Sequence, residues 1–136
     1  MLRTIEQIVT LRATPRAIYR TFLSSREHSA MTGFPASVSA RPGSAFTAFG
    51  GVLSGSNLLL VRDRLIVQRW RSNKFRRSDV DSILMISLEP FRGGTRIHLV
   101  HVNVPSHDFK GVTRGWNKYY WRPWAAYLAG RKPEGK

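Results

Sequence analysis

Cysteine is absent from this sequence of 136 residues, which excludes disulfides, a thiol nucleophile and a thiolate metal site. This absence fits a reducing cytoplasm. No apolar run approaches the ~20 residues that a membrane-spanning helix needs. Glu6 and Arg12 interrupt the first apolar stretch, so we also expect no secretory signal peptide. Together these absences predict a cytoplasmic protein without a membrane span.

Acidic residues are also scarce. Eight Asp and Glu face 22 Lys and Arg, which gives a net charge of +14 at pH 7. A surface of this kind attracts polyanions in a salt-dependent way. Because no nucleic-acid-binding motif accompanies the charge, a solvated basic surface without a specific partner is the simpler interpretation.

The rest of the composition is that of an ordinary globular protein, with 42% hydrophobic and 22% charged residues. The length suits one domain with a single core, and we expect residues 1–136 to form it. The tail at 131–136 is basic and contains Pro133 and Gly135, so we expect it to fray.

The segment 111–130 contains three of the four Trp and three of the four Tyr residues. Its apolar residues recur at three- and four-residue steps, which predicts one side of a long helix. The apolar side comprises Val112, Trp116, Tyr119, Tyr120, Pro123, Tyr127 and Leu128. The other side is polar and comprises mainly Thr113, Arg114, Asn117, Lys118 and Arg122. So many rings need a broad concave surface to bury them, and we expect a curved sheet to provide it.

A strand and two short helices are predicted at the start of the chain. Thr14 is a suitable N-cap and Pro15 a suitable first residue for the first helix. Ser24 or Ser25 caps the second helix, and Gly33 is placed to end it. The expected bounds are 4–13 for the strand, 15–23 for the first helix and about 25–31 for the second.

Between residues 36 and 104 the pattern is typical of strands separated by short turns. The expected strands are 36–40, 45–49, 52–61, 64–71, 80–89 and 95–104. Neighbours this close in sequence pair antiparallel. We therefore predict an α+β fold of the helix-grip type. In it, a curved antiparallel sheet of about six or seven strands wraps around a long C-terminal helix, with two short helices after the first strand.

Six short segments give the chain a family resemblance. They are His28–Gly33 (HSAMTG), Phe49–Gly51 (FGG), Ile66–Arg71 (IVQRWR), Gly94–Thr95 (GT), His101–Pro105 (HVNVP) and Gly115–Trp124 (GWNKYYWRPW). With these segments in this order, nearly the whole chain resembles the AHSA or Aha-type family. That family is named after the C-terminal domain of the activator of the Hsp90 ATPase, and it belongs to the SRPBCC superfamily of START/Bet v-like folds.

The resemblance implies a cavity between the sheet and the long helix. It implies little about activity, because many members are single bacterial domains of unknown role. The eukaryotic co-chaperones of the family carry an additional N-terminal domain that makes much of the chaperone contact. This sequence shows no such domain, so chaperone activation is not the leading expectation.

Alternation along the strands, combined with the helical spacing, predicts which residues face that cavity. They are Ile66, Gln68, Trp70, Leu84, Ile86, Leu99, His101, Trp116 and Tyr120. Gln68, His101 and Asn103 would be polar groups in an apolar surround, where an unpaired group costs roughly 1–3 kcal/mol. They can bond one another, a tyrosine or a trapped water, or they can orient the polar end of a ligand.

The sequence offers no metal or catalytic constellation. His98 and His101 lie on opposite faces of one strand, and no Cys or suitably spaced carboxylate accompanies them. His101 has the right side chain for a general base, but no nucleophile, carboxylate pair or phosphate loop accompanies it. We therefore expect no metal and no cofactor, and we do not expect an enzyme.

The basic residues include a cluster and a stripe. The cluster comprises Arg62, Arg64, Arg69, Arg71, Lys74, Arg76 and Arg77. A stripe of Arg114, Lys118 and Arg122 is expected on the outer side of the long helix, with Trp121 between them. Such a surface can hold a phosphate backbone or an acidic protein, or it can simply be solvated.

Two functional hypotheses follow from the sequence. The first is a small hydrophobic ligand held between the sheet and the long helix, with Gln68 and His101 at its polar end. The second is an interaction module, resembling a co-chaperone, that uses its basic surface on an acidic protein or nucleic acid. The oligomeric state does not follow from the sequence.

Overall fold

Six strands form one antiparallel sheet in the computed structural model, which describes residues 1–130. Their order is β1-β6-β5-β4-β3-β2, so the first and last strands of the chain are neighbours. The bounds are β1 (Leu2–Leu11), β2 (Ala45–Ala48), β3 (Leu53–Val61), β4 (Leu65–Ser72), β5 (Ser82–Phe91) and β6 (Gly94–Pro105). Residues 131–136, for which we predict a frayed tail, lie outside the described residues.

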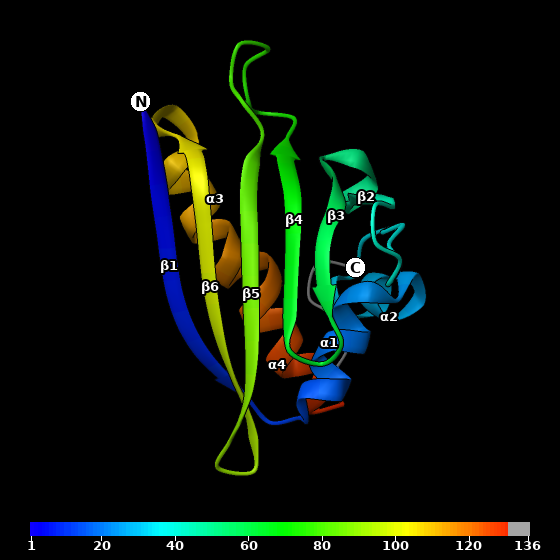
Figure 1. Ribbon diagram of the computed structural model, residues 1–136. Helices are drawn as coiled ribbons and strands as arrows, with labels where there is room; N and C mark the ends of the chain where they lie inside the picture. Colours follow the sequence, from blue (N-terminus) through cyan, green and yellow to red (C-terminus); the bar gives the residue numbers. More distant parts are fainter. Residues whose placement is uncertain (131–136) are drawn as a thin grey trace.

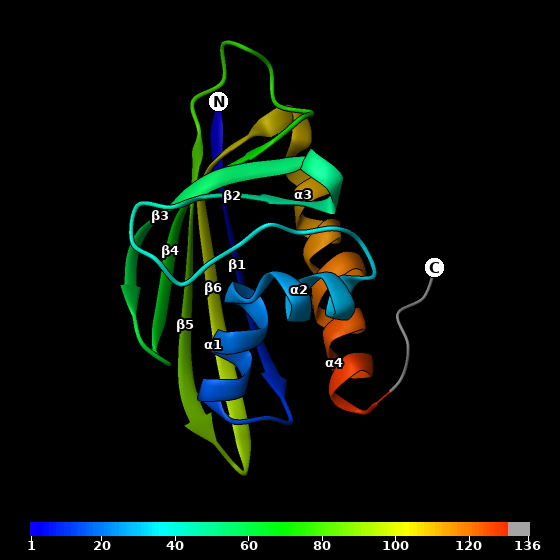
Figure 2. The same ribbon diagram turned by 90° about the vertical axis from the view of Figure 1, so that its right-hand side faces the viewer.

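The helices gather on one face of this sheet. Figures 1 and 2 show α3 and α4 running along the inner face, with α1 and α2 beside them. The α-helices are α1 (Pro15–Leu23), α2 (Ser25–Thr32), α3 (Phe109–Gly115) and α4 (Arg122–Leu128). Two single 3-10 turns are η1 (Phe49–Gly51) and η2 (Ser106–Asp108), and a π-helical segment is η3 (Trp116–Trp121). Because α3, η3 and α4 follow one another without a break, they form the long C-terminal helix of the predicted helix-grip fold.

Capping residues set the bounds of the two short helices, as predicted. Thr14 accepts a hydrogen bond from a backbone N–H of the first turn of α1 at 3.2 Å. Ser24 accepts the equivalent bond for α2, also at 3.2 Å. Gly33 ends α2 with a φ of 84°, a left-handed conformation that glycine adopts at little cost.

The predicted strand at 36–40 does not form, and a single bridge is its only connection to β2. Side chains from other segments form hydrogen bonds with further backbone groups of residues 36–40. Ser25 Oγ bonds both the N–H and the C=O of Val38, at 2.9 and 3.0 Å. Asn57 Nδ2 donates to the carbonyl of Ser39 at 2.9 Å. Since these side chains already satisfy the backbone, the sheet has six strands and not seven.

The C-terminal helix is not the regular α-helix that we predict. Its buried aromatic residues are Trp116, Tyr120, Trp121 and Trp124, at positions i, i+4, i+5 and i+8. A regular α-helix brings i, i+3, i+4 and i+7 to one side. The π segment η3 contains one extra residue, and the extra residue accounts for the shift.

Because of the π segment, the residues that this helix buries differ from those that we predict. Tyr119, expected inside, is 42% exposed. Trp121, expected outside among basic residues, is buried and stacks between Trp116 and Trp124 at centroid distances of 5.6 and 6.1 Å. Trp124 is buried as well, although the predicted apolar side omits it.

Alternation along β4, β5 and β6 brings the expected residues inward, among them Ile66, Leu84 and Leu99. The alternation breaks at Asn103, which has a left-handed φ of 62° and is half-buried. Val104, the next residue, is fully buried as a result. Asn103 therefore leaves the inner face on which we expect it.

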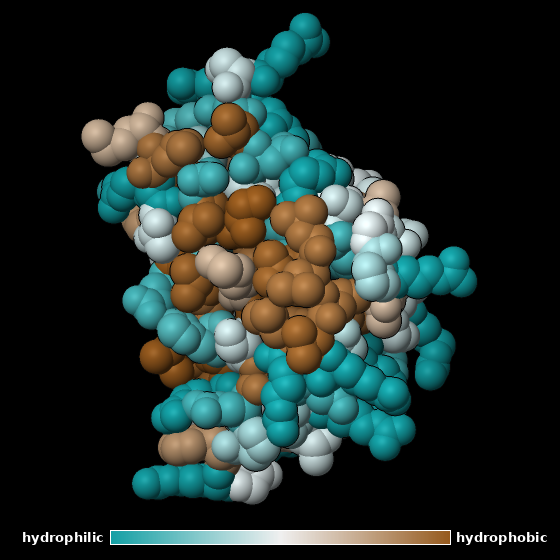
Figure 3. All heavy atoms as spheres, in the orientation of Figure 1, coloured by the Kyte–Doolittle hydropathy of each residue, from teal (hydrophilic) through white to brown (hydrophobic). Residues whose placement is uncertain are grey.

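The outer face of the sheet is also partly apolar. Figure 3 shows an apolar area at its centre with hydrophilic residues above and below. Cross-strand pairing places Leu59, Val67, Met85 and Val100 in one row across this face. We call these four residues the outer apolar row. An antiparallel sheet with one solvated face normally has polar side chains there, so the row is unusual.

Candidate functional site

An aromatic pocket of about 340 Å3 opens at one end of the interface between the sheet and the C-terminal helix. It lies where η1 and the end of β4 approach α3 and η3. Its lining residues are Phe34, Phe49, Val52, Leu53, Trp70, Ser72, Lys74, Asp108, Gly111, Val112, Gly115, Trp116, Tyr119 and Tyr120. A mainly apolar hollow with few polar groups is the usual form of a small-molecule site.

Rings from three parts of the chain form the walls of this pocket. The ring of Phe49 lies 5.4 Å from that of Phe34 and 5.6 Å from those of Tyr119 and Tyr120, measured between centroids. Tyr120 in turn lies 4.8 Å from Trp116. These distances are typical of aromatic pairs, so the rings support one another.

Backbone conformation in η1 brings Phe49 to the helix. Phe49, Gly50 and Gly51 have φ values of 54°, 66° and 103°, three left-handed residues in succession. Two glycines adopt such angles at little cost, whereas Phe49 is strained there. The reversal they make turns the chain from β2 into β3 and keeps the Phe49 ring against Tyr119 and Tyr120.

The hydroxyl of Tyr120 is hydrogen-bonded to a buried histidine. It lies 2.9 Å from His28 Nε2, while His28 Nδ1 lies 2.8 Å from the carbonyl of Phe22. The carbonyl can only accept, so Nδ1 carries the proton and Nε2 accepts from the Tyr120 hydroxyl. Burial lowers the pKa of His28 and raises that of Tyr120, so both are neutral at pH 7. Tyr120 therefore offers the pocket only its ring.

His101 is held in a similar chain of hydrogen bonds. Trp116 donates its indole N–H to His101 Nδ1 at 3.2 Å, so His101 carries its proton on Nε2. That nitrogen lies 2.8 Å from Ser82 Oγ, which donates to the carbonyl of Trp70 at 2.8 Å. Burial lowers the pKa of His101 to about 3. With both nitrogens bonded, His101 is a neutral core residue that cannot serve as a base.

Polar groups of the pocket lie at Lys74, Asp108 and Ser72. Ser72 Oγ accepts from the backbone N–H of Lys74 at 3.1 Å. The side chains of Lys74 and Asp108 make no ion pair within residues 1–130. A ligand can therefore reach one cationic and one anionic group at this site.

The structure brings three of the nine predicted cavity residues to the pocket, namely Trp70, Trp116 and Tyr120. The other six lie in the core, each at most 1% exposed: Ile66, Gln68, Leu84, Ile86, Leu99 and His101. The stacked indoles of Trp116, Trp121 and Trp124 belong to the same buried core. Gln68 donates to Asn57 Oδ1 at 2.9 Å, and its own Oε1 has no partner among the described residues.

Sequence reasoning missed the part of the pocket that loops provide. Phe34 follows α2, Phe49 belongs to η1, and Lys74 follows β4. Periodicity predicts which face of a strand or helix a side chain occupies, but it does not predict which loops lie next to one another. The pair Gly50-Gly51 after Phe49 was the one available signal, because it marks a reversal that exposes the preceding ring.

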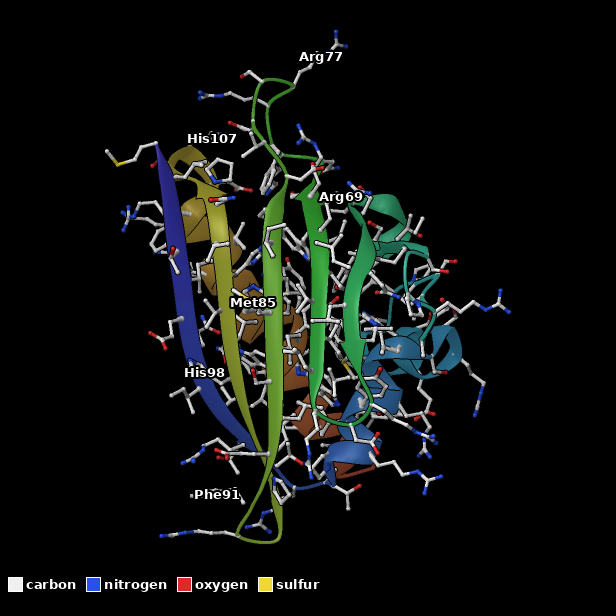
Figure 4. The ribbon with its side chains drawn as sticks, viewed as in Figure 1. Arg69, Arg77, Met85, Phe91, His98 and His107 are labelled. Carbon is white, nitrogen blue, oxygen red and sulfur yellow. The ribbon has the colours of Figure 1, made fainter. Side chains whose placement is uncertain are left out.

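The predicted basic residues do not form one surface. Arg69 and Arg71 lie on the outer face of β4, where Asp81 bridges them at 3.0 and 2.9 Å. Figure 4 shows Arg69 in the second half of β4 and Arg77 at the tip of the following loop. Arg76 lies in the same loop and Lys74 at the pocket, whereas Arg62 and Arg64 lie in the turn between β3 and β4. Arg114, Lys118 and Arg122 belong to the C-terminal helix, on the opposite side of the sheet from Arg69 and Arg71.

The loop between β4 and β5 is held by these ion pairs. Burial raises the pKa of Asp81, but hydrogen bonds and charges of Arg71 and Arg69 outweigh burial and hold it below its usual range. Asp79 bonds His107 Nε2 at 2.8 Å, and this bond lowers the pKa of Asp79. Arg69 and Arg71 are therefore partly neutralised within the chain.

No group of three or more His, Asp or Glu side chains within residues 1–130 is placed to hold a metal ion. Over the same residues, every helix is too short or too polar to cross a bilayer.

Comparison with protein families gives one match over most of the chain. Residues 12–129 match the model of the family described as "Activator of Hsp90 ATPase homolog 1-like protein". The human protein named "Activator of 90 kDa heat shock protein ATPase homolog 1" is 26% identical over 111 residues, which is 82% of this chain. That match covers 32% of the human protein, so the chain spans about a third of this relative's length.

Solved structures share the fold. An Hsp90 activator from Plasmodium falciparum superposes with a TM-score of 0.83 at 18% identity, covering 93% of this chain and 96% of that one. The Aha1 dimer from Colwellia psychrerythraea gives a TM-score of 0.76 at 17% identity, covering 91% and 95%. A protein from Chromobacterium violaceum gives 0.73 at 26% identity, covering 92% and 96%.

Proposed function

The chain belongs to the family of activator of Hsp90 ATPase homolog 1-like proteins, and within it we propose that this protein binds a small, mainly apolar ligand in the aromatic pocket. The observation that supports the proposal is a hollow of about 340 Å3 with aromatic walls, lined also by Lys74 and Asp108, which make no ion pair within residues 1–130. A fully filled interface would leave no such space.

The lining suggests the class of ligand. Trp116 and Tyr120 present apolar ring surface, because their polar atoms are bonded to His101 and His28. The polar end of the ligand would therefore meet Lys74 and Asp108, and not Gln68 and His101 as the sequence suggests. An aromatic or short aliphatic body with a hydroxyl, carboxyl or amine at one end fits this arrangement.

A ligand panel with native mass spectrometry and thermal unfolding tests the proposal. The panel contains medium-chain fatty acids, fatty alcohols and substituted phenols. Ligand at one hundred times its Kd stabilises the folded state by about 2.7 kcal/mol, which corresponds to a rise in Tm of roughly 5–10 °C. No bound species and no rise in Tm across the panel would rule the proposal out.

Two matched variants make the test specific for this pocket. Val52 lines the pocket and is 41% exposed, so Val52→Trp fills the opening with little disturbance of the core. Val80 is 54% exposed and lies outside the pocket, so Val80→Trp is the control. We expect binding to be lost in the first variant and kept in the second.

A second candidate function is docking of an acidic protein on the outer face of the sheet. The outer apolar row lies beside Arg69 and Arg71, and the chain carries a net charge of +14. Exposed apolar surface next to cationic side chains favours a partner with an apolar centre and an acidic border. The relatives named as Hsp90 activators suggest purified Hsp90 as the partner to test.

Met85 lies near the middle of β5 (Figure 4), between Val67 and Val100, so Met85→Asp places a negative charge within the outer apolar row. Val80→Asp changes the charge equally at an exposed position outside the row. We expect Hsp90 binding that weakens with salt, falls in Met85→Asp and persists in Val80→Asp. Binding that is absent, or equally weakened by both variants, would exclude this surface.

A further inference from the structure

A second hollow, which we call the arginine groove, lies between α1 and the turn that joins β3 to β4. Its volume is about 470 Å3, and it shares no lining residue with the aromatic pocket. Its lining residues are Arg16, Tyr19, Arg20, Leu23, Ser24, Ala40, Pro42, Leu60, Arg62 and Asp63. Neither proposed function above uses it.

Three guanidinium groups from two elements border this groove. Arg16 and Arg20 are four residues apart on α1 and so lie on one side of that helix, and Arg62 belongs to the opposite turn. Within residues 1–130, Arg16 and Arg62 make no ion pair and no side-chain hydrogen bond. Arg20 bonds Glu27 through Nε at 3.0 Å, which leaves its two terminal nitrogens for another acceptor.

The groove also offers an acceptor and an apolar floor. Tyr19, Arg62 and Asp63 line the groove together, and burial raises the pKa of Tyr19, with a further rise from the charge of Asp63 and an opposing effect of Arg62. Leu23 is 5% exposed and forms part of the floor with Leu60. Asp63 is the one carboxylate among the lining residues.

We propose that the arginine groove binds a small phosphate ester that carries hydroxyl groups, such as a sugar phosphate or a nucleotide. The planar, permanently charged guanidinium of arginine matches phosphate oxygens in pairs, and those of Arg16 and Arg62 make no ion pair with any residue that the structure describes. A bare anion would be repelled by Asp63. A hydroxyl group beside the phosphate instead gives Asp63 a donor, and the apolar floor covers the carbon skeleton.

Isothermal titration of the full chain tests this proposal with AMP, ribose 5-phosphate, adenosine and inorganic phosphate as probes. We expect saturable binding of AMP, of ribose 5-phosphate or of both. The ester that binds more tightly shows whether the ligand is a nucleotide or a sugar phosphate. If adenosine or inorganic phosphate binds as tightly as both esters do, the proposal is wrong. Absence of ester binding would overturn it as well.

Matched double variants separate the groove from general charge attraction. Arg16→Gln with Arg62→Gln removes two charges from the groove, and Arg77→Gln with Arg114→Gln removes two exposed charges elsewhere. We expect the first pair to weaken ester binding roughly tenfold or more, because charge-assisted hydrogen bonds are lost. The second pair should leave it within about twofold. If both double variants weaken ester binding equally, the esters do not bind in the arginine groove.

Asp63→Gly provides a test in which the two explanations predict opposite signs, because it removes both the charge and the acceptor. Asp63 has a left-handed φ of 61°, which glycine adopts at little cost, so the variant should fold. If Asp63 accepts a ligand hydroxyl, the variant weakens ester binding and strengthens that of inorganic phosphate. If only net charge matters, both become tighter, and that result would contradict the proposal.

Discussion

Trp116 donates its indole N–H to Nδ1 of His101 over 3.2 Å, and this bond joins the C-terminal helix to the last strand of the sheet. It also sets the proton on Nε2, from which the chain continues through Ser82 Oγ to the carbonyl of Trp70. Four residues from η3, β4, β5 and β6 are therefore linked in a fully buried polar network. His101, the strongest candidate for a base in the sequence, is a part of this network.

Trp116→Phe should lower the free energy of unfolding by about 2 kcal/mol, because it leaves His101 Nδ1 buried without a donor. Trp121→Phe is the matched control. Trp121 donates to Gln7 Oε1 at 2.7 Å, and Gln7 is only half-buried, so water can replace the indole. We expect Trp121→Phe to lower the free energy of unfolding by about 0.5–1 kcal/mol, in addition to the effect of the smaller ring. Urea denaturation measures both, and equal losses would contradict the role assigned to the network.

Stability should fall in acid because of the buried histidines. The pKa of His101 is about 3 in the folded state, against 6.5 for an unperturbed histidine, and the pKa of His28 is also lowered. Between these values the unfolded state binds a proton that the folded state does not. The free energy of unfolding therefore falls as the pH drops from about 6.5 toward 3, by about 1.4 kcal/mol per pH unit for His101 alone.

Urea midpoints between pH 7 and pH 4 measure this dependence. His101→Gln removes one titrating group and should reduce the slope by about 1.4 kcal/mol per pH unit, whatever its effect at pH 7. A slope unchanged in His101→Gln would show that the histidine does not remain neutral in the folded state.

Deletion of Lys118 should preserve the fold. The buried residues Trp116, Tyr120, Trp121 and Trp124 would then stand at i, i+3, i+4 and i+7, the spacing of a regular α-helix. Lys118 is exposed, so little packing is lost, and we expect a change in stability within about 1 kcal/mol. The aromatic pocket should be altered, because η3 supplies part of its wall, and ligand binding should fall.

Deletion of Arg114 is the control for that experiment. Arg114 is also exposed but lies in α3, where there is no extra residue to absorb the loss. All later residues would rotate by about 100° relative to Val112, which takes the buried rings out of the core. We expect a loss of several kcal/mol, on the scale of about 3–5 kcal/mol for one removed Trp. If both deletions behave alike in thermal unfolding, the π segment does not act as an inserted residue.

Gly55→Ala should destabilise the sheet strongly. A Cβ at this position would lie 1.8 Å from the carbonyl oxygen of Arg69 and 2.7 Å from Cε2 of Phe46. Because the first neighbour is backbone of the paired strand, it cannot move without breaking the ladder, and we expect a cost of about 3 kcal/mol or more. Ser54→Ala, on the outer face of the same strand, should stay within about 0.5 kcal/mol when urea midpoints are compared.

Local signals in the sequence predict where helices begin and end, whereas contacts between distant segments do not follow from such signals. Thr14, Ser24 and Gly33 act within one turn of a helix, and each bounds the element that its residue type predicts. The strand at 36–40 fails because Ser25 and Asn57, distant in sequence, occupy its backbone groups. Alternation cannot reveal such competition, since it describes only which face a side chain takes.

The same distinction holds for the aromatic pocket. Trp70, Trp116 and Tyr120 were predicted because they belong to periodic elements, and they reach the pocket. The other lining rings, such as Phe34 and Phe49, come from loops. Six predicted residues are buried in the core and do not line it, because alternation separates inner from outer faces but does not show where the inner face is left open.

The amino-acid sequence alone determined the element order apart from the strand at 36–40, the two helix caps, the antiparallel hairpins and the presence of a ring-rich helix that must be covered, because each depends on residues near one another in the chain. Only the tertiary structure decided which rings are covered, where space remains between them and which charges meet an opposite charge. Those properties depend on how side chains from separate elements fill a common volume, and neither spacing nor composition specifies that filling.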